Sequence, residues 1–122
     1  MIPNRPFGAR VMRLVDDLAR HTDGPGLTRL YLSPAHRRTV EAVRALMEEA
    51  GLAAHVDAVG NAVGRFGPAR GPVLLIGSHV DSVVDAGRFD GPLGVVAGLV
   101  AIEALAREGA DLPFAIELLA FG

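Results

Sequence analysis

Three side chains of the kinds that bind metals lie in one short part of the sequence: His79, Asp81 and Asp90. His79 and Asp81 are two positions apart, so both side chains point the same way if the extended conformation of the preceding apolar segment continues. A neutral imidazole can bind a metal through one ring nitrogen while a neighbouring carboxylate orients the ring and raises its basicity. Asp90 begins the next predicted helix, where its carboxylate can reach back over the strand end. The three residues together predict half of a metal site.

Each of these residues also has a purely structural explanation. Asp90 is followed by Gly-Pro, which is a good helix start, so its carboxylate could serve as a helix cap. His79 could be an ordinary loop histidine, and Asp81 could close an Asx-turn. The metal site is favoured because all three residues fall on one strand-to-helix loop. Open α/β sheets place their sites at this carboxyl end of a strand.

The other histidines fit structural roles better. His21 is expected in the last turn of a first helix, where a partial positive charge suits the helix dipole. His36 is expected in the solvated first turn of a second helix, and His55 on the polar face of a strand.

Composition limits both the class of protein and the kind of metal site. The chain has 122 residues, half of them hydrophobic and 21% charged, with a net charge of −2. These values predict one globular domain and exclude a disordered tail or a basic nucleic-acid binder. Cysteine is absent, so any metal must be bound by His, Asp or Glu.

The sequence predicts a cytoplasmic protein that does not enter a membrane. Its first residues lack the uninterrupted apolar core of a signal peptide. The most apolar stretch, Leu93–Leu105, is shorter than the ~20 residues that cross a bilayer. It is therefore expected to be a buried helix.

Apolar spacing predicts two helices in the first part of the chain. Phe7 to Leu18 follows the spacing of an amphipathic helix. Ser33 followed by Pro34 is a helix start, with the serine as cap and the proline in the first turn. This second helix is expected to run to Ala50, where Gly51 can take the left-handed closing position.

The later part of the chain predicts a mixed sheet. Ala53–Ala58 and Ala62–Phe66 are expected to pair as an antiparallel hairpin across a tight turn at Gly60-Asn61. The apolar run Val73–Ile76 is expected to be a central strand covered on both faces. A helix from Pro92 to about Arg107 and a strand over Phe114–Phe121 complete a parallel crossover.

The predicted fold class is therefore α/β, part of an α/β/α sandwich whose mixed sheet joins an antiparallel hairpin to parallel strands. The helix from Pro92 is apolar nearly all round, so it is expected to be the most buried helix. The chain ends at Gly122, directly after a strand that is predicted to be buried, so the domain is expected to be cut short.

Several motifs resemble one group of enzymes. Gly-Ser-His-Val-Asp-Ser at 77–82, Gly-Arg-Phe-Asp-Gly-Pro-Leu-Gly at 87–94 and Asp-Ala-Val-Gly-Asn at 57–61 look like the allantoate amidohydrolase and N-carbamoyl-L-amino-acid hydrolase group. That group belongs to the di-metal aminoacylase and carboxypeptidase superfamily. Residues 27–34 and 114–122 resemble the same group, so the match covers nearly the whole chain.

This resemblance implies roles for particular residues. His79 matches the histidine that binds one metal, Asp90 the carboxylate that bridges both metals, and Asp81 the acid that orients the histidine and assists catalysis. Two zinc or manganese ions would be the cofactors. The implied reaction is hydrolysis of a ureido or carbamoyl C–N bond in a small molecule, with allantoate favoured over an N-carbamoyl-L-amino acid. Asn61 is interpreted first as a turn residue.

The resemblance also implies that residues 1–122 are the amino-terminal portion of a metallo-amidohydrolase catalytic domain. Members of the group continue into an acidic pair that supplies the general base, then into a lid and dimerisation domain, and the complete enzyme is expected to be a homodimer. The chain alone is expected to be inactive. Two alternatives remain: a related aminopeptidase or deacylase, against which the Gly-Ser-His opening argues, and a non-catalytic fragment.

Overall fold

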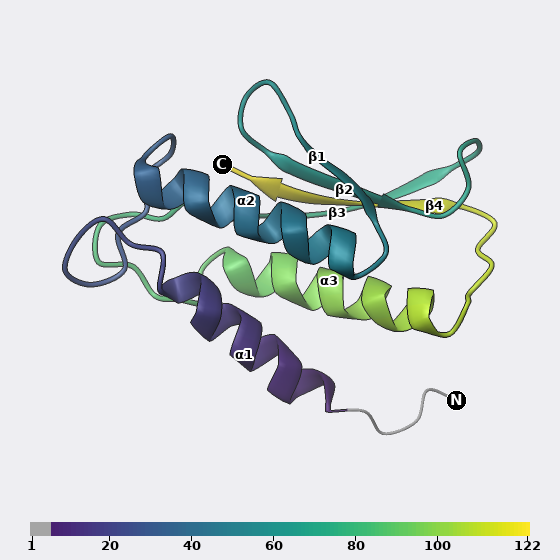
Figure 1. The fold of residues 1–122 in the computed structure, drawn as a ribbon, viewed down its shortest axis with the longest axis horizontal. Helices are drawn as coiled ribbons and strands as arrows, with labels where there is room; N and C mark the ends of the chain where they lie inside the picture. Colours follow the sequence, from purple (N-terminus) through teal and green to yellow (C-terminus); the bar gives the residue numbers. More distant parts are fainter. Residues whose placement is uncertain (1–5) are drawn as a thin grey trace.

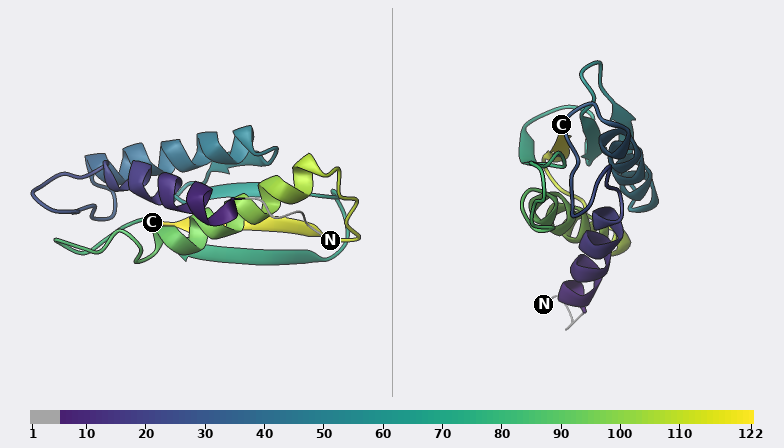
Figure 2. Two further views of the ribbon diagram at one scale, coloured as in Figure 1. Left: turned by 90° about the horizontal axis from the view of Figure 1, so that it is seen from below. Right: turned by 90° about the vertical axis from the view of Figure 1, so that its left-hand side faces the viewer.

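The computed structural model describes residues 6–122 and contains a four-stranded mixed sheet with helices against one of its faces (Figures 1 and 2). In chain order the elements are α1 (Phe7–Ala19), α2 (Pro34–Glu49), β1 (Ala53–Val56), β2 (Ala62–Phe66), β3 (Val73–His79), α3 (Pro92–Arg107) and β4 (Ala115–Phe121). The strand order is β1-β2-β4-β3. β3 and β4 are parallel, and the other neighbouring strands are antiparallel. The predicted α/β fold, with a hairpin joined to a parallel pair, is confirmed.

Local sequence signals fix the ends of α2 as predicted. The Ser33 side chain accepts a hydrogen bond from the backbone N–H of His36 at 3.2 Å, and Pro34 occupies the first turn. At the other end, Gly51 has a φ of +96°, a conformation that side chains with a Cβ rarely adopt. The cap and the glycine mark the two ends of this helix, and the Asp23 carboxylate also accepts from the backbone N–H of Ala35 in its first turn.

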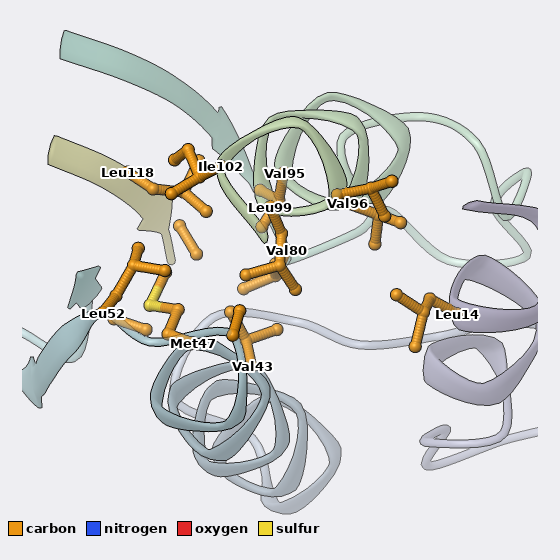
Figure 3. Packing of buried hydrophobic residues seen from close by; sticks show 14 of the residues in the cluster. Leu14, Val43, Met47, Leu52, Val80, Val95, Val96, Leu99, Ile102 and Leu118 are labelled. Atoms are coloured by element: carbon orange, nitrogen blue, oxygen red, sulfur yellow. The ribbon is translucent and has the colours of Figure 1, made fainter. Parts of the chain in front are cut away.

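The helix α3 is the most buried helix of the described chain, as predicted. Nine of its 16 residues are buried, against six of 16 in α2 and three of 13 in α1. Figure 3 shows Val95 and Leu99 of α3 close to Val80, with Val43 of α2 nearby and Leu118 of β4 beside Ile102. Even so, neither α3 nor any other helix within residues 6–122 has the length and apolarity of a membrane span.

One charged side chain of α3 is buried and pairs with a partly exposed arginine of α1. Glu103 is 6% exposed, and its carboxylate accepts hydrogen bonds from Nε and Nη2 of Arg10 at 2.7 and 2.8 Å. These bonds raise the pKa of the Arg10 guanidinium. This two-pronged pair fixes α1 against α3 at a position where an unpaired carboxylate would be costly.

The strand β3 differs from its prediction, which was wrong about its place in the sheet. Among residues 6–122 it pairs only with β4 and forms an edge of the sheet, and β4 lies between it and β2. Leu74 and Leu75 are 49% and 60% exposed. An apolar run shows that a segment prefers a sheet, but it does not show how many neighbours the strand has.

The helices of residues 6–122 lie on one side of the sheet. α2 contacts β1 and β2, α3 contacts β3 and β4, and all three helices lie below the sheet in the view of Figure 1. The opposite face carries Arg65 and Glu117, whose side chains form an ion pair at 3.0 Å. The described residues therefore supply two layers of the expected three-layer sandwich.

The hairpin loop is longer than the predicted two-residue turn. The backbone N–H of Asp57 donates to the carbonyl of Asn61 at 2.9 Å, so residues 58–60 form the loop and Asn61 lies beyond it. The Asn61 side chain donates to the Asp57 carboxylate at 2.9 Å and accepts from the backbone N–H of Gly122 at 3.0 Å. Asn61 thus ties the hairpin to the end of β4, a role that its interpretation as a turn residue missed.

The predictions for His21 and His36 were also wrong. His36 is 2% exposed rather than solvated. His21 lies beyond the end of α1, half-buried, with Nδ1 3.2 Å from the Thr39 hydroxyl. Burial lowers the pKa of both imidazoles, and the charges of Arg29 and Arg38 lower that of His21 further. Both rings therefore favour the neutral form, and neither serves as a cation at a helix end.

This burial predicts that the chain loses stability in mild acid. The folded-state pKa of His36 lies below the ordinary value of 6.5, so the unfolded chain binds more protons as the pH falls through that value. We expect a lower urea midpoint at pH 5.5 than at pH 7.5, and a weaker pH dependence in His36→Asn. His55 is exposed, so His55→Asn is the matched control. Equal pH dependence in the parent and His36→Asn would contradict this explanation.

Candidate metal centre

The end of β3 places His79 and Asp81 on the same side of the chain, as the two-residue spacing predicts. Pairing with β4 continues one residue past the strand, because the backbone N–H of Val80 donates to the carbonyl of Phe121 at 2.8 Å. The segment stays extended through Val80, and the side chains of its two neighbours therefore turn toward one another.

The His79 ring lies between two carboxylates. Its Nδ1 is 3.1 Å from the Asp81 side-chain Oδ1 and 3.1 Å from the Asp81 backbone carbonyl oxygen. Its Nε2 is 3.5 Å from Oδ1 of Asp90. Because both oxygens beside Nδ1 are acceptors, the neutral ring carries its proton on Nδ1. The lone pair of Nε2 is then directed toward the Asp90 side.

The structural alternatives for the two aspartates are not observed. The N-cap residue of α3 is Gly91, and no side chain caps this helix. The carboxylate of Asp90 is 77% exposed and faces His79 instead. Within residues 6–122, no hydrogen bond runs from the backbone N–H of Val83 to Asp81, as an Asx-turn would require. Both carboxylates are therefore available to the site.

Close contact between β3 and the start of α3 brings Asp90 to the histidine. The Ser78 hydroxyl donates to the carbonyl of Gly91 at 2.8 Å. Gly91 has a φ of +100°, and a Cβ at this position would lie 2.5 Å from the His79 ring. At Gly94, a Cβ would lie 2.8 Å from that of Ser78. A side chain at either position would block this approach, so both glycines are needed for it.

The arrangement fits two ligands of one divalent cation. Two atoms each about 2.1 Å from a tetrahedral zinc ion lie about 3.4 Å apart. The distance of 3.5 Å between His79 Nε2 and Asp90 Oδ1 is close to this value. Asp81 contacts the opposite nitrogen of the ring, so it is placed to orient the histidine. No three His, Asp or Glu side chains in the described part of the chain converge on one metal position.

Comparison with known proteins gives relatives in both sequence and structure. No family model matches the chain. Allantoate deiminase of Arabidopsis thaliana is 41% identical over 111 residues, which cover 88% of this chain and 20% of that protein. The N-carbamoyl-L-amino acid amidohydrolase of Geobacillus stearothermophilus is 38% identical over 123 residues, covering 99% of this chain and 30% of that protein.

A solved structure shares the fold as well. A hydantoinase/carbamoylase family amidase from Burkholderia ambifaria superimposes with a TM-score of 0.86 at 37% sequence identity, over 93% of this chain and 29% of the amidase. The chain is homologous to the hydantoinase/carbamoylase family amidases. It spans about a fifth to three tenths of the length of these relatives. The predicted resemblance is confirmed over nearly the whole chain.

The homology with hydantoinase/carbamoylase amidases was predicted from motifs. The buried arginine next to the candidate site was not predicted. Arg29 is completely buried and donates to the carbonyl of Val80, next to His79. It lies in a connector without clear periodicity, between Leu27 and Leu32, where an arginine is expected to be exposed. No sequence pattern marks its burial, because this depends on contacts with segments distant in the chain.

Proposed function

We propose that this chain provides part of the active site of a metal-dependent amidohydrolase acting on a ureido or carbamoyl C–N bond. The observation that carries the proposal is the His79 ring, held by Asp81 at Nδ1 with Nε2 facing Asp90. The substrate class follows from the names of the relatives, which are allantoate deiminases and N-carbamoyl-L-amino acid amidohydrolases. Allantoate and N-carbamoyl-L-amino acids are thus the substrates to test.

In this proposal each residue has a distinct task. His79, through Nε2, and Asp90, through its carboxylate, would hold the zinc or manganese ions. Asp81 keeps the proton on Nδ1 and fixes the ring plane. The chemistry that such cations would supply is activation of a water and polarisation of the scissile amide carbonyl. Asp90 is 77% exposed, so the ligand atoms are accessible to substrate and to further ligands.

The rest of the site is proposed to come from residues outside this chain. Catalytic zinc usually has three protein ligands and a water, whereas His79 and Asp90 provide two side chains. A carboxylate that acts as general base on the attacking water is also needed. Because the chain spans 20–30% of its curated relatives, we propose a complete enzyme that supplies these groups, forms a homodimer and works in the cytoplasm.

We therefore expect the 122-residue chain alone to hydrolyse neither substrate and to bind metal weakly, with a dissociation constant above the micromolar range. The reason is the small number of ligands: two side chains cannot replace the water shell of two cations. The assay adds zinc or manganese to the purified chain, with allantoate or an N-carbamoyl-L-amino acid, beside a metal-only blank. Calorimetry gives the affinity. Turnover above the blank, or tighter binding, would show that the chain is more complete than proposed.

The position of the weakly bound metal tests the site itself. Millimolar zinc should shift the ring nitrogen signals of His79 in NMR spectra and leave those of the exposed His55 unchanged. Asp90→Asn should reduce this shift, because it removes the charged ligand. Zinc that leaves the His79 signals unchanged would overturn the proposed metal site.

A further inference from the structure

Arg29 contacts the segment that carries Asp81 from the buried side. The arginine has no exposed surface. Its Nε donates to the carbonyl of Val80 at 2.7 Å, and its backbone N–H donates to the Ser82 hydroxyl at 2.8 Å. In return, the backbone N–H of Ser82 donates to the Arg29 carbonyl at 2.7 Å. These three contacts hold the residues on both sides of Asp81.

The same guanidinium also binds the end of α1. Its Nη1 donates to the carbonyl of Leu18 at 2.7 Å and to that of His21 at 3.0 Å. Burial lowers the pKa of Arg29, and the negative charge of Asp81 opposes this effect. An arginine keeps its charge even so. A buried cation therefore joins α1 to the loop that carries Asp81, whose negative charge opposes the effect of burial.

Val80 cannot turn without breaking contacts in three directions. Its side chain is fully buried and lies among core residues that include Val43 and Leu99 (Figure 3). Its N–H binds the carbonyl of Phe121, and its own carbonyl binds Arg29. The backbone on both sides of Asp81 is therefore held in place, at Val80 and at Ser82.

We propose that Arg29 is a positioning residue that sets the orientation of Asp81 and, through Asp81, of the His79 ring. The role of Arg29 in metal binding rests on the proposed function, but the orientation of the His79 ring can be measured without metal. The planar guanidinium reaches the Val80 and Leu18 carbonyls at the same time. The ammonium group of a lysine is a point charge and cannot reproduce this fork.

Arg29→Lys therefore tests the proposal while keeping a positive charge. In the metal-free chain at pH 8, NMR of the ring nitrogens reports which one carries the proton. We expect the fraction of His79 with the proton on Nδ1 to fall and the amide of Ser82 to exchange about tenfold faster, as in a locally opened segment. Arg10→Lys is the matched control, because Arg10 makes a similar two-pronged contact with Glu103. It should lower stability without changing the His79 signals.

Ser82→Ala is a second, milder variant that removes only the hydroxyl. This hydroxyl accepts from the backbone N–H of Arg29 and donates to the carbonyl of Val83. We expect it to lower the fraction of His79 with the proton on Nδ1 and to speed amide exchange at position 82, each by less than Arg29→Lys does. The decisive variant is Arg29→Lys if circular dichroism shows it folded, and Ser82→Ala if it is not. Parent-like His79 signals and parent-like exchange at position 82 in the decisive variant would overturn the proposal.

Zinc titrations separate this inference from the proposed function. If zinc binds at His79, Arg29→Lys should weaken that binding about 10–100-fold, as loss of an outer partner does. If the Arg29 variants shift the His79 ring but zinc leaves the parent ring unchanged, the metal site is wrong and the positioning role stands. If zinc binds the parent and the variant equally, with unchanged ring signals, the positioning role is wrong and the metal site stands.

Discussion

Asp90→Ala and His79→Ala are each expected to abolish hydrolysis in the complete enzyme, together with its bound metal. The two ligand atoms lie 3.5 Å apart, and the loss of either leaves the cation too few protein ligands. Metal content and turnover should be measured on the same preparations. Full activity in Asp90→Ala would end its assignment as a ligand shared by two metals.

Asp81→Asn provides the contrast within the same loop. Asp81 contacts the nitrogen of His79 that does not face Asp90, so its amide variant should retain metal and react more slowly, by about 10–100-fold. Asp111 is a distant aspartate beyond the end of α3, and Asp111→Asn is the matched control, expected to keep full rate. A metal-free Asp81→Asn enzyme would contradict the expectation that Asp81 acts on the rate and leaves the metal in place.

Leu118→Ala is expected to cost the chain about 2–5 kcal/mol of unfolding free energy. Leu118 is fully buried on the inner strand β4 and packs among residues of α3 (Figure 3). Small domains have total stabilities of only about 5–15 kcal/mol, so this loss is a large part of the whole. Urea unfolding followed by circular dichroism gives the value.

Leu75→Ala is the matched control, because it removes the same atoms from the edge strand β3. Leu75 is 60% exposed, and we expect a loss below about 1 kcal/mol. If β3 were the central, covered strand that its apolar run suggests, the two variants would cost the same. Equal losses would therefore contradict the exposure of Leu75 and the uncovered face of the sheet.

The sequence predicted most elements of the fold because their signals are local. Ser33 and Gly51 mark the ends of α2 by side-chain chemistry and backbone freedom alone. The position of β3 was not predictable in this way. Val73–Ile76 has the same composition whether it has one neighbour or two, and its place depends on where β4 inserts.

Burial of polar residues was the other part that the sequence could not show. His36 and Arg29 are buried because distant segments cover them, and Arg29 finds its acceptors at Leu18 and Val80. The candidate site was more accessible to prediction. His79 and Asp81 share a side because of strand periodicity, and only the approach of Asp90 needed the packing of α3 on β3.

The open edge of β3 has a consequence for how molecules of this chain meet one another. Its segment Val73–Gly77 carries no charge and no proline, and the described residues leave one side of the strand without a partner. Natural edge strands are protected by lysines, prolines or bulges, because free N–H and C=O groups attract further strands. An uncharged edge of this kind favours pairing between two copies of the chain at high concentration. The measured stability and affinity would then depend on protein concentration, so each folding or binding measurement requires a dilution series.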